Sequence, residues 1–250
     1  MIIKYLIKLP IFKRLIPSLF KKYIFFTKNH WKLKKIEGVK YLLDTRYLID
    51  RNFYLRENYE DELFFLTQKI IIKNKIDFFL DLGACWGIYS LRLSKIKKLK
   101  IMAFDPIDKN LNRLKEMIRI NNIKNIKFFL SALGNIKGKV KFYGLEKFTP
   151  NYSIYDKKNK NTYIADINKL DNLVKIKNKT LYLKVDVESH EYYLFLGAKQ
   201  LLQNNKITIQ CEVIKNKRKV FKLFKKNKFK LLYHKVNTDD YIFSNYIEEI

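Results

Sequence analysis

Hydrophobic residues follow a regular pattern from about residue 77 to the end of the chain. Short apolar runs typical of buried strands alternate there with segments whose apolar residues recur at helical spacing. The strand-like runs cover residues 77–82, 100–104, 126–130, 181–187 and 206–213. The helical segments between them cover residues 87–97, 108–121, 190–204 and 217–227. This alternation predicts βαβ units and a parallel sheet with helices on both faces.

Two further strand candidates, residues 229–236 and 240–247, close the chain and are joined by Asn237–Asp239. A connection that short makes an antiparallel pair, because a parallel return needs a dozen residues or more. Residues 144–179 are the least regular part of this region, and we expect an insertion over the carboxyl end of the sheet. The pattern therefore predicts an α/β fold with an antiparallel last strand.

The first 73 residues have a different pattern. Apolar pairs recur every fourth position over residues 11–24, and the gaps hold Lys13/Arg14, Pro17/Ser18 and Lys21/Lys22. A step of four drifts by only about 40° around a helix, so this is a basic amphipathic helix. Residues 39–55 are strand-like with a turn near Asp44–Arg46, and 59–73 are helical. We divide the chain into an extension, 1–55, and a main domain, 56–250.

Composition excludes a disordered chain, since 48% of the 250 residues are hydrophobic and 15% are aromatic. Fifty-two Lys and Arg face 24 Asp and Glu, a net charge of +28. Such an excess suggests a polyanionic partner, either nucleic acid or an anionic membrane surface. For the basic helix two roles stay open: it packs on the main domain, or it lies on an anionic leaflet through residues 11–24.

Two cysteines, Cys85 and Cys211, are too few for a disulfide scaffold and suit a reducing compartment. No apolar run approaches the length of a membrane span. Lys4, Lys8 and Pro10 interrupt the core that a signal peptide would need. We therefore expect a cytoplasmic protein that contacts the membrane only peripherally, if at all.

The segment from 78 to 93 carries the most specific chemistry. An apolar strand runs into Asp81, and Gly83 and Gly87 flank a tight turn before a helix. Glycines there let backbone N–H groups approach a ligand at the carboxyl end of the strand. The spacing matches neither the dinucleotide fingerprint nor a phosphate loop. A cationic adenosine cofactor without phosphates, S-adenosylmethionine, suits the acidic Asp81 better.

Asp105 ends the next strand, 18 residues after Gly87 (105 − 87). A carboxylate at that position accepts the hydrogen bonds of a ribose diol. The alternative is a helix cap in front of Pro106.

Five segments resemble, in order, the blocks of the FkbM-type family of S-adenosylmethionine-dependent methyltransferases (class I). They are DLGACWGIYSL, AFDPIDKNLNRLKEMIRIN, SALG, LDNL and LKVDVESHEYYLFLGAKQLL, and the resemblance covers roughly residues 56–247. It implies a Rossmann-like sheet of seven strands, mostly parallel, with the last strand antiparallel. It also implies O-methylation, usually of sugar hydroxyls in glycans or of polyketide hydroxyls.

The resemblance also implies roles for individual residues. The methionine part of the cofactor would meet the turn and the acidic entry to the fold, formed by Glu60, Asp81, Gly83, Ala84, Cys85 and Gly87. The ribose and adenine would meet Asp105, Pro106, Asn110, Ser131 and Ala132. Two positions depart from the family: Cys85 stands where Asn is usual, and Ser189 replaces the Gly of DVEGHE.

The reacting end is an acidic block that follows the strand LYLKV: Asp186, Glu188, His190 and Glu191. Alternation along the strand sends Asp186 and Glu188 to one face, and His190 falls near the start of the next helix. Methyl transfer depends mostly on alignment, worth roughly 7–11 kcal/mol at best, and a general base adds a factor of about 10²–10⁴.

We expect His190 or Asp186 to take the hydroxyl proton and Glu188 and Glu191 to orient the acceptor. Two alternatives stay open: Asp186 and Glu191 cap the following helix, or the four groups bind a metal ion. No metal is our expectation. Glu212, at the end of a later strand, is a second-tier candidate, and Asn151 and Ser153 in the insertion are weak substrate contacts.

The leading hypothesis is an O-methyltransferase acting on a sugar or glycan hydroxyl, in polysaccharide or glycolipid biosynthesis. An RNA methyltransferase that uses the basic surface is the enzymatic alternative, and a non-catalytic membrane-peripheral or nucleic-acid-binding module is the other. Nucleic acid is the less favoured partner. DVESHE lacks the Asn/Asp-Pro-Pro-aromatic tetrad of base N-methylation, and Cys211 has no basic neighbour to activate it.

Overall fold

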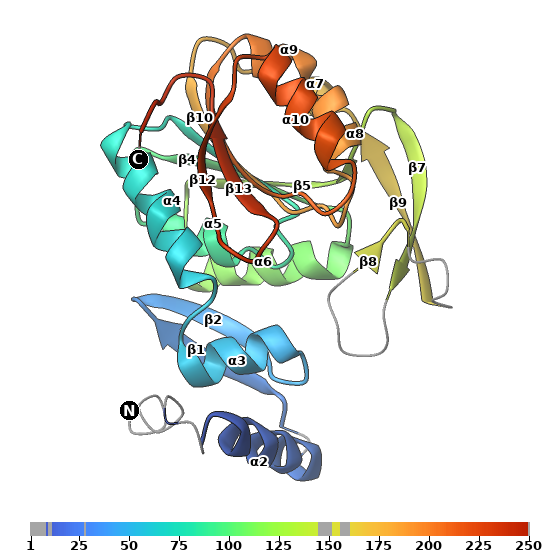
Figure 1. Ribbon diagram of the computed structural model, residues 1–250. Helices are drawn as coiled ribbons and strands as arrows, with labels where there is room; N and C mark the ends of the chain where they lie inside the picture. Colours follow the sequence, from blue (N-terminus) through green and yellow to red (C-terminus); the bar gives the residue numbers. More distant parts are fainter. Residues whose placement is uncertain (1–8, 10–11, 28, 145–151, 156–160, 250) are drawn as a thin grey trace.

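A seven-stranded sheet forms the centre of the molecule (Figure 1). The computed structural model describes all residues except 1–8, 10–11, 28, 145–151, 156–160 and 250. The strands lie in the order β12-β13-β11-β10-β3-β4-β5. Their bounds are Lys230–His234, Asp240–Ser244, Lys206–Glu212, Thr180–Val185, Phe78–Leu82, Lys100–Asp105 and Ile126–Leu130 in the same order.

Strand β13 pairs antiparallel with both β11 and β12, and the remaining neighbours pair in parallel. The sheet is therefore mostly parallel with an antiparallel last strand. This confirms the predicted fold class, a Rossmann-like α/β fold with a seven-stranded, mostly parallel sheet.

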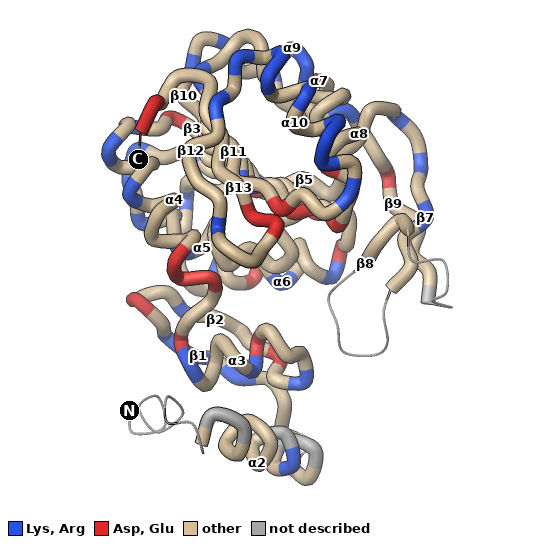
Figure 2. Tube along the Cα trace, in the orientation of Figure 1, with Lys and Arg blue, Asp and Glu red and all other residues tan. Residues whose placement is uncertain are grey.

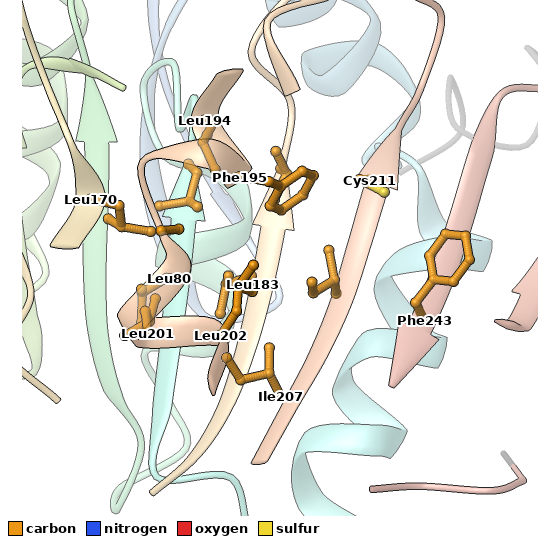
Figure 3. Packing of buried hydrophobic residues seen from close by; sticks show 14 of the residues in the cluster. Leu80, Leu170, Leu183, Leu194, Phe195, Leu201, Leu202, Ile207, Cys211 and Phe243 are labelled. Atoms are coloured by element: carbon orange, nitrogen blue, oxygen red, sulfur yellow. The ribbon is translucent and has the colours of Figure 1, made fainter. Parts of the chain in front are cut away.

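Alternate side chains of the central strands pack into two hydrophobic cores, one on each face of the sheet. Leu80, Leu183 and Ile209 face the helices α7 (Leu170–Leu173), α8 (Glu191–Leu196), α9 (Lys199–Gln203) and α10 (Lys217–Lys226). Figure 3 shows this packing, with Leu194 and Leu202 lying over the sheet. Phe79 and Tyr182 point to the opposite face, toward α4 (Asp61–Lys73) and α5 (Ile88–Leu93). Because both faces are covered, the strands are almost continuously apolar.

The predicted helix over 190–204 is wrong in one respect, because it is two helices, α8 and α9. They break at Gly197, where an added Cβ would lie 1.9 Å from the carbonyl oxygen of Gly134. The same glycine N–H bonds back to the Leu194 carbonyl at 2.9 Å, which ends α8. The helix therefore stops where the chain must pass against the loop after β6 (Ala132–Leu133).

The extension also differs from expectation. The strand-like stretch 39–55 is strand β2 (Val39–Asp44) followed by a helix, α3 (Leu48–Arg56), and β2 pairs with a preceding strand, β1 (Trp31–Ile36). The chain turns at Asp44, whose carboxylate accepts bonds from the backbone and side chain of Arg46. Residues 48–55 have strand-like composition, but this turn and the packing of α3 on the core make them helical.

The extension shares its core with the main domain. Tyr41, Leu43 and Phe53 are buried in the same cluster as Trp86 and Leu114. The ring of Tyr41 meets that of Phe53 edge-on with centroids 5.0 Å apart. These contacts hold β2 and α3 against α5 and α6 (Asp108–Ile120).

The basic helix of the sequence is present as α2 (Phe12–Thr27) and lies at the end of the molecule remote from α9 (Figure 1). Among the helices that the structure describes, none combines the length and apolar character needed to cross a membrane.

A second, small sheet lies beside β5 (Figure 1), and the expected insertion, 144–179, supplies only part of it because the sheet begins at Ala132. Its order is β6-β9-β7-β8, with β7 at Gly138–Gly144, β8 at Tyr152–Ser153 and β9 at Asn161–Asn168. This part of the chain is more regular than the sequence indicated, because residues 161–167 of β9 pair with β7.

Candidate functional site

A cavity of about 250 Å³ opens at the carboxyl edge of the sheet, beside the ends of β3, β4, β10 and β11. Both predicted segments line it, the turn after β3 and the acidic block after β10. Its walls are Ile49, Tyr59, Gly83, Cys85, Phe104, Asp105, Pro106, Ile107, Asn110, Ser131, Ala132, Leu133, Phe142, Ile154, Asp186, Val187, Glu188, His190 and Glu212. Open α/β sheets bind their ligands at this edge.

Gly83 brings the two segments together. Its backbone has φ +87°, and an added Cβ would lie 1.8 Å from the carbonyl oxygen of Asp186. Across the same contact, the Asp186 N–H donates to the Leu82 carbonyl at 2.9 Å. Only a residue without a side chain allows the turn after β3 to touch the end of β10.

The backbone donors of this turn correct one expectation. The N–H groups of Gly83 and Ala84 both donate to the Phe104 carbonyl, at 3.0 and 2.9 Å, and the Cys85 N–H donates to Asp105 Oδ2 at 2.9 Å. These three amides therefore hold the turn to β4 instead of reaching toward a ligand. Gly87 lies under the site and does not line it, since its Cβ would meet Leu114 Cδ1 at 2.7 Å.

A smaller hollow of about 40 Å³ shares walls with the cavity and contains a buried charge cluster. Its walls include Asp81, Ala84, Lys184 and Asp186. Lys184 Nζ lies 3.1 Å from Asp186 Oδ2. Burial opposes the charge of Lys184, but the carboxylates of Asp186, Glu60 and Asp81 outweigh it and hold its pKa well above the ordinary value.

Asp81 and Glu60 are fixed by hydroxyl groups around this hollow. Asp81 Oδ2 accepts from Ser90 Oγ at 2.6 Å, and Glu60 Oε2 accepts from the Tyr89 hydroxyl at 3.0 Å. Burial raises the pKa of Asp81, against the effect of Lys184 and Ser90. Glu60 does not line either space itself. Three carboxylates around one ammonium make this end of the site suited to a cation.

The other end of the cavity is built around Asp105. Its Oδ1 accepts from the Ile107 N–H at 2.8 Å and from Asn110 Nδ2 at 3.1 Å. Burial raises the pKa of Asp105 to about 7. The alternative of a helix cap is wrong for Asp105, because α6 begins at Asp108 and Ile107 is its N-cap residue; the bond from the Ile107 N–H closes a turn before the helix, and Asp105 lines the cavity. Pro106, Asn110, Ser131 and Ala132 line it beside Asp105, and their contact with a cofactor stays a prediction.

The acidic block lies in a turn and not on a strand. β10 ends at Val185, and Glu188 and Ser189 have φ values of +52° and +73°. Strand alternation therefore does not place Asp186 and Glu188, although both line the cavity. The left-handed backbone at Ser189 is the conformation that a glycine favours, which is the residue usual in the family pattern.

His190 occupies the position before α8 and is held by two aromatic side chains. Its Nδ1 lies 2.7 Å from the Tyr155 hydroxyl, and its ring stacks on Tyr193 with centroids 4.9 Å apart. Burial lowers the pKa of His190 to about 4. The imidazole is therefore neutral near pH 7.

Glu191 and Glu212 differ from their predicted ranks. Glu191 does not line the cavity; its Oε1 accepts from the Ser189 N–H at 3.1 Å, a bond to the turn in front of α8, whose N-cap residue is His190. Glu212 does line the cavity, from the end of β11. Burial, together with the carboxylates of Asp186 and Asp240, raises the pKa of Glu212 to about 7.

Two residues of the site, Lys184 and Tyr155, were not predicted from the sequence. A lysine inside the otherwise apolar strand LYLKV was the available signal for Lys184. Tyr155 reaches His190 from the insertion, and no local pattern marks it. Ser153 does not line the cavity, and Asn151 lies outside the described residues. No group of three His, Cys, Asp or Glu placed to bind a metal ion occurs in the described part of the chain.

We predict that Gly83→Ala lowers the free energy of unfolding by at least about 2 kcal/mol, because the new Cβ collides with the Asp186 carbonyl. Gly138→Ala is the matched control, since its Cβ would meet nothing within 4 Å. Urea denaturation measures both. Equal stabilities for the two variants would contradict the close approach of the two segments.

Ser189→Gly is predicted to raise the free energy of unfolding by about 1 kcal/mol, because it relieves a left-handed backbone. Ser94→Gly should instead lower it by about 1 kcal/mol, since Ser94 has a right-handed helical backbone at φ −58°. Thermal and urea unfolding of the two variants check the signs. A loss of stability in Ser189→Gly would show that the turn does not have this conformation.

No family model matches the chain, and no curated protein matches it. Its fold is similar to those of solved methyltransferases. An rRNA methylase from Streptococcus thermophilus has 13% sequence identity and a TM-score of 0.42. The match covers 68% of this chain and 85% of that protein.

Two more solved structures are similar in the same way. The tRNA (uracil-54, C5)-methyltransferase of Pyrococcus abyssi, in complex with S-adenosyl-L-homocysteine, has 12% sequence identity and a TM-score of 0.47. The match covers 86% of this chain and 44% of that protein. The ribosomal protein L11 methylase of Lactobacillus delbrueckii subsp. bulgaricus has 12% sequence identity and a TM-score of 0.46. The match covers 75% of this chain and 78% of that protein. At these values the similarity concerns the fold alone, and membership of the FkbM-type family stays a prediction.

Proposed function

We propose that the protein is an S-adenosylmethionine-dependent O-methyltransferase whose acceptor is a hydroxyl of a sugar or glycan. The observation that carries the proposal is one cavity lined by both the turn after β3 and the acidic turn after β10. A cofactor and an acceptor bound in that cavity would meet at the block from Asp186 to His190.

The residues present fit the charges of S-adenosylmethionine. Its methionine part carries an ammonium, a sulfonium and a carboxylate. In the smaller hollow, Asp81 and Asp186 suit the two cationic groups and Lys184 suits the carboxylate. Glu60, bonded to Tyr89, adds negative charge beside them. This end of the site is therefore matched to a ligand with both signs of charge.

The opposite end fits an adenosine. Three of the roughly four acceptor positions of the Asp105 carboxylate are taken by Cys85, Ile107 and Asn110. One position remains for a ribose hydroxyl. Because the Asn110 side-chain NH₂ is the group donating to Asp105, its amide oxygen supplies a second acceptor. Ser131 and Ala132 line the wall beyond, where an adenine would lie.

The acceptor space favours a neutral, hydroxyl-rich molecule over RNA. The described lining of the cavity contains four carboxylates, Asp105, Asp186, Glu188 and Glu212, and neither Lys nor Arg. Figure 2 shows Asp and Glu gathered beside β13 and below β5, whereas Lys and Arg are spread over outer helices such as α9 and α10. Phosphate groups would be repelled at such an edge, whereas sugar hydroxyls can donate to carboxylates.

When bound, S-adenosylmethionine would supply an activated methyl group, which the acceptor oxygen would take as the C–S bond breaks and leaves its electron pair on sulfur. The chain must align the acceptor and remove one proton. Asp186, Glu188 and Glu212 orient hydroxyls by accepting their hydrogen bonds. His190 takes the proton at Nε2, in the tautomer whose Nδ1–H donates to the Tyr155 oxygen.

A turnover screen tests the proposal. Purified protein is incubated with S-adenosylmethionine and either nucleotide sugars, lipid-linked glycans or tRNA and rRNA fragments, and products are detected by their mass shift. We expect methylation of a glycan acceptor that survives nuclease treatment. Methylation of RNA alone would overturn the acceptor class, and the absence of S-adenosylmethionine binding in calorimetry would overturn the enzyme proposal.

Binding and turnover are predicted to separate between two variants. Asp81→Asn removes a carboxylate from the cation-binding end and should raise the Kd for S-adenosylmethionine at least about tenfold. His190→Ala should leave that Kd within about twofold and lower kcat about 100-fold. His234→Ala is the matched control, since His234 bonds to Thr238 on the last hairpin. Equal loss of binding in Asp81→Asn and His190→Ala would remove His190 from the catalytic role.

Cofactor affinity is predicted to depend on pH through Asp105. Its ionised form binds the ribose, and burial raises its pKa to about 7. Affinity should therefore be full above about pH 8 and fall as the pH drops below 7, by up to about tenfold per unit. Calorimetric titrations from pH 5.5 to 8.5, roughly spanning that pKa, measure this. Asp105→Asn should remove the dependence, and an unchanged pH profile in that variant would contradict the assignment.

A further inference from the structure

Helix α2 presents an exposed apolar stripe. Leu15, Leu19, Tyr23 and Phe26 are between 47 and 79% exposed. At 100° per residue these four positions fall within about 80° of one another, so they form one face of the helix. Lys22 is exposed at the edge of this face. We call Leu15, Leu19, Tyr23 and Phe26 the α2 stripe.

The adjacent face of α2 is already used for packing. Ile16 and Phe20 are half-buried, and the ring of Phe20 stacks on Tyr54 of α3 with centroids 5.4 Å apart. Lys34 also contacts the Tyr54 ring, with its Nζ 4.9 Å from the ring centroid. The same Nζ forms an ion pair with Glu57 at 2.8 Å. The helix is therefore held with the α2 stripe turned outward. Packing on the domain explains one face of the helix and leaves the second unexplained.

The charge around the stripe indicates what covers it. The first 36 residues contain ten Lys and Arg and no Asp or Glu: positions 4, 8, 13, 14, 21, 22, 28, 32, 34 and 35. Apolar side chains that enter the acyl boundary, flanked by Lys that meets anionic headgroups, are the features of an interfacial helix. A polyanion such as RNA would use the charge and leave the stripe exposed.

Helix α10 provides an internal comparison. Its sequence KRKVFKLFKK is as basic as any in the chain, but its apolar residues Val220 and Phe224 are buried in the core. A basic helix with its apolar face covered is an ordinary solvated surface. Helix α2 carries fewer Lys and Arg, four in 16 residues against six in ten, but it combines them with an apolar face that is exposed to solvent.

We propose that the α2 stripe docks on an anionic membrane leaflet. Helix α3 would then connect the membrane to the site, because its Tyr54 holds α2 and its Ile49 lines the cavity. The docking itself depends on the stripe and its charge and is independent of the proposed methyl transfer.

Vesicle flotation of the full chain tests the proposal. The probes are phosphatidylcholine vesicles with about 30% phosphatidylglycerol and the same vesicles without it. Leu19→Glu/Phe26→Glu is the test variant. Ile72→Glu/Val236→Glu is the matched control, since these two apolar residues on α4 and after β12 are 59 and 76% exposed. Circular dichroism and thermal unfolding verify that both variants remain folded.

We expect wild type and control to float with the anionic vesicles alone, and the test variant to bind them at least about tenfold more weakly. Equal flotation of test and control variants, abolished for both in about 0.5 M NaCl, would reduce the contact to general adsorption of a basic protein and overturn the role of the stripe. Two other results would also overturn it. One is tight RNA binding without vesicle binding, and the other is a dimer that dissociates in the test variant.

Discussion

The close approach of Gly83 to the Asp186 carbonyl is the contact on which the site depends. It joins the turn after β3 to the turn after β10, so that residues about a hundred positions apart line one cavity. A larger residue at position 83 would separate them. The hydrogen bond from the Asp186 N–H to the Leu82 carbonyl and those from Gly83 and Ala84 to Phe104 fix the same junction from the backbone. The geometry of the site is thus set by the main chain, and the side chains add its charge.

Lys184 explains how so many acidic groups are tolerated beside this junction. It lies inside β10 with its Nζ against Asp186 and close to Asp81 and Glu60. Asp81 is buried, and an uncompensated carboxylate there would be costly; the buried ammonium of Lys184 lowers that cost for Asp81 and for the partly exposed Asp186 beside it. The remaining excess of negative charge is what a sulfonium and an ammonium would neutralise. In the proposed enzyme, cofactor binding and relief of this charge imbalance are the same event.

Much of the fold could be predicted from periodicity, and less of the site. The alternation after residue 77 predicts the strands of the sheet, and the short link Asn237–Asp239 predicts the antiparallel β13, because these depend on local patterns. The split between α8 and α9, the helix α3 and the bond from Tyr155 to His190 depend on partners distant in sequence, Gly134, the core around Trp86 and the insertion. The acidic block could be identified in the sequence by its residue types. Its turn conformation, the burial of Glu191 and the place of Lys184 beside it could not be predicted there.

A crystal structure with S-adenosylhomocysteine would show directly where the cofactor binds. We expect the amino-acid end of the ligand in the hollow beside Lys184 and Asp81, its ribose at Asp105 and Asn110, and its sulfur facing the turn from Asp186 to His190. Density for the ligand at another edge of the sheet, or a ligand whose sulfur faces away from that turn, would contradict this expectation.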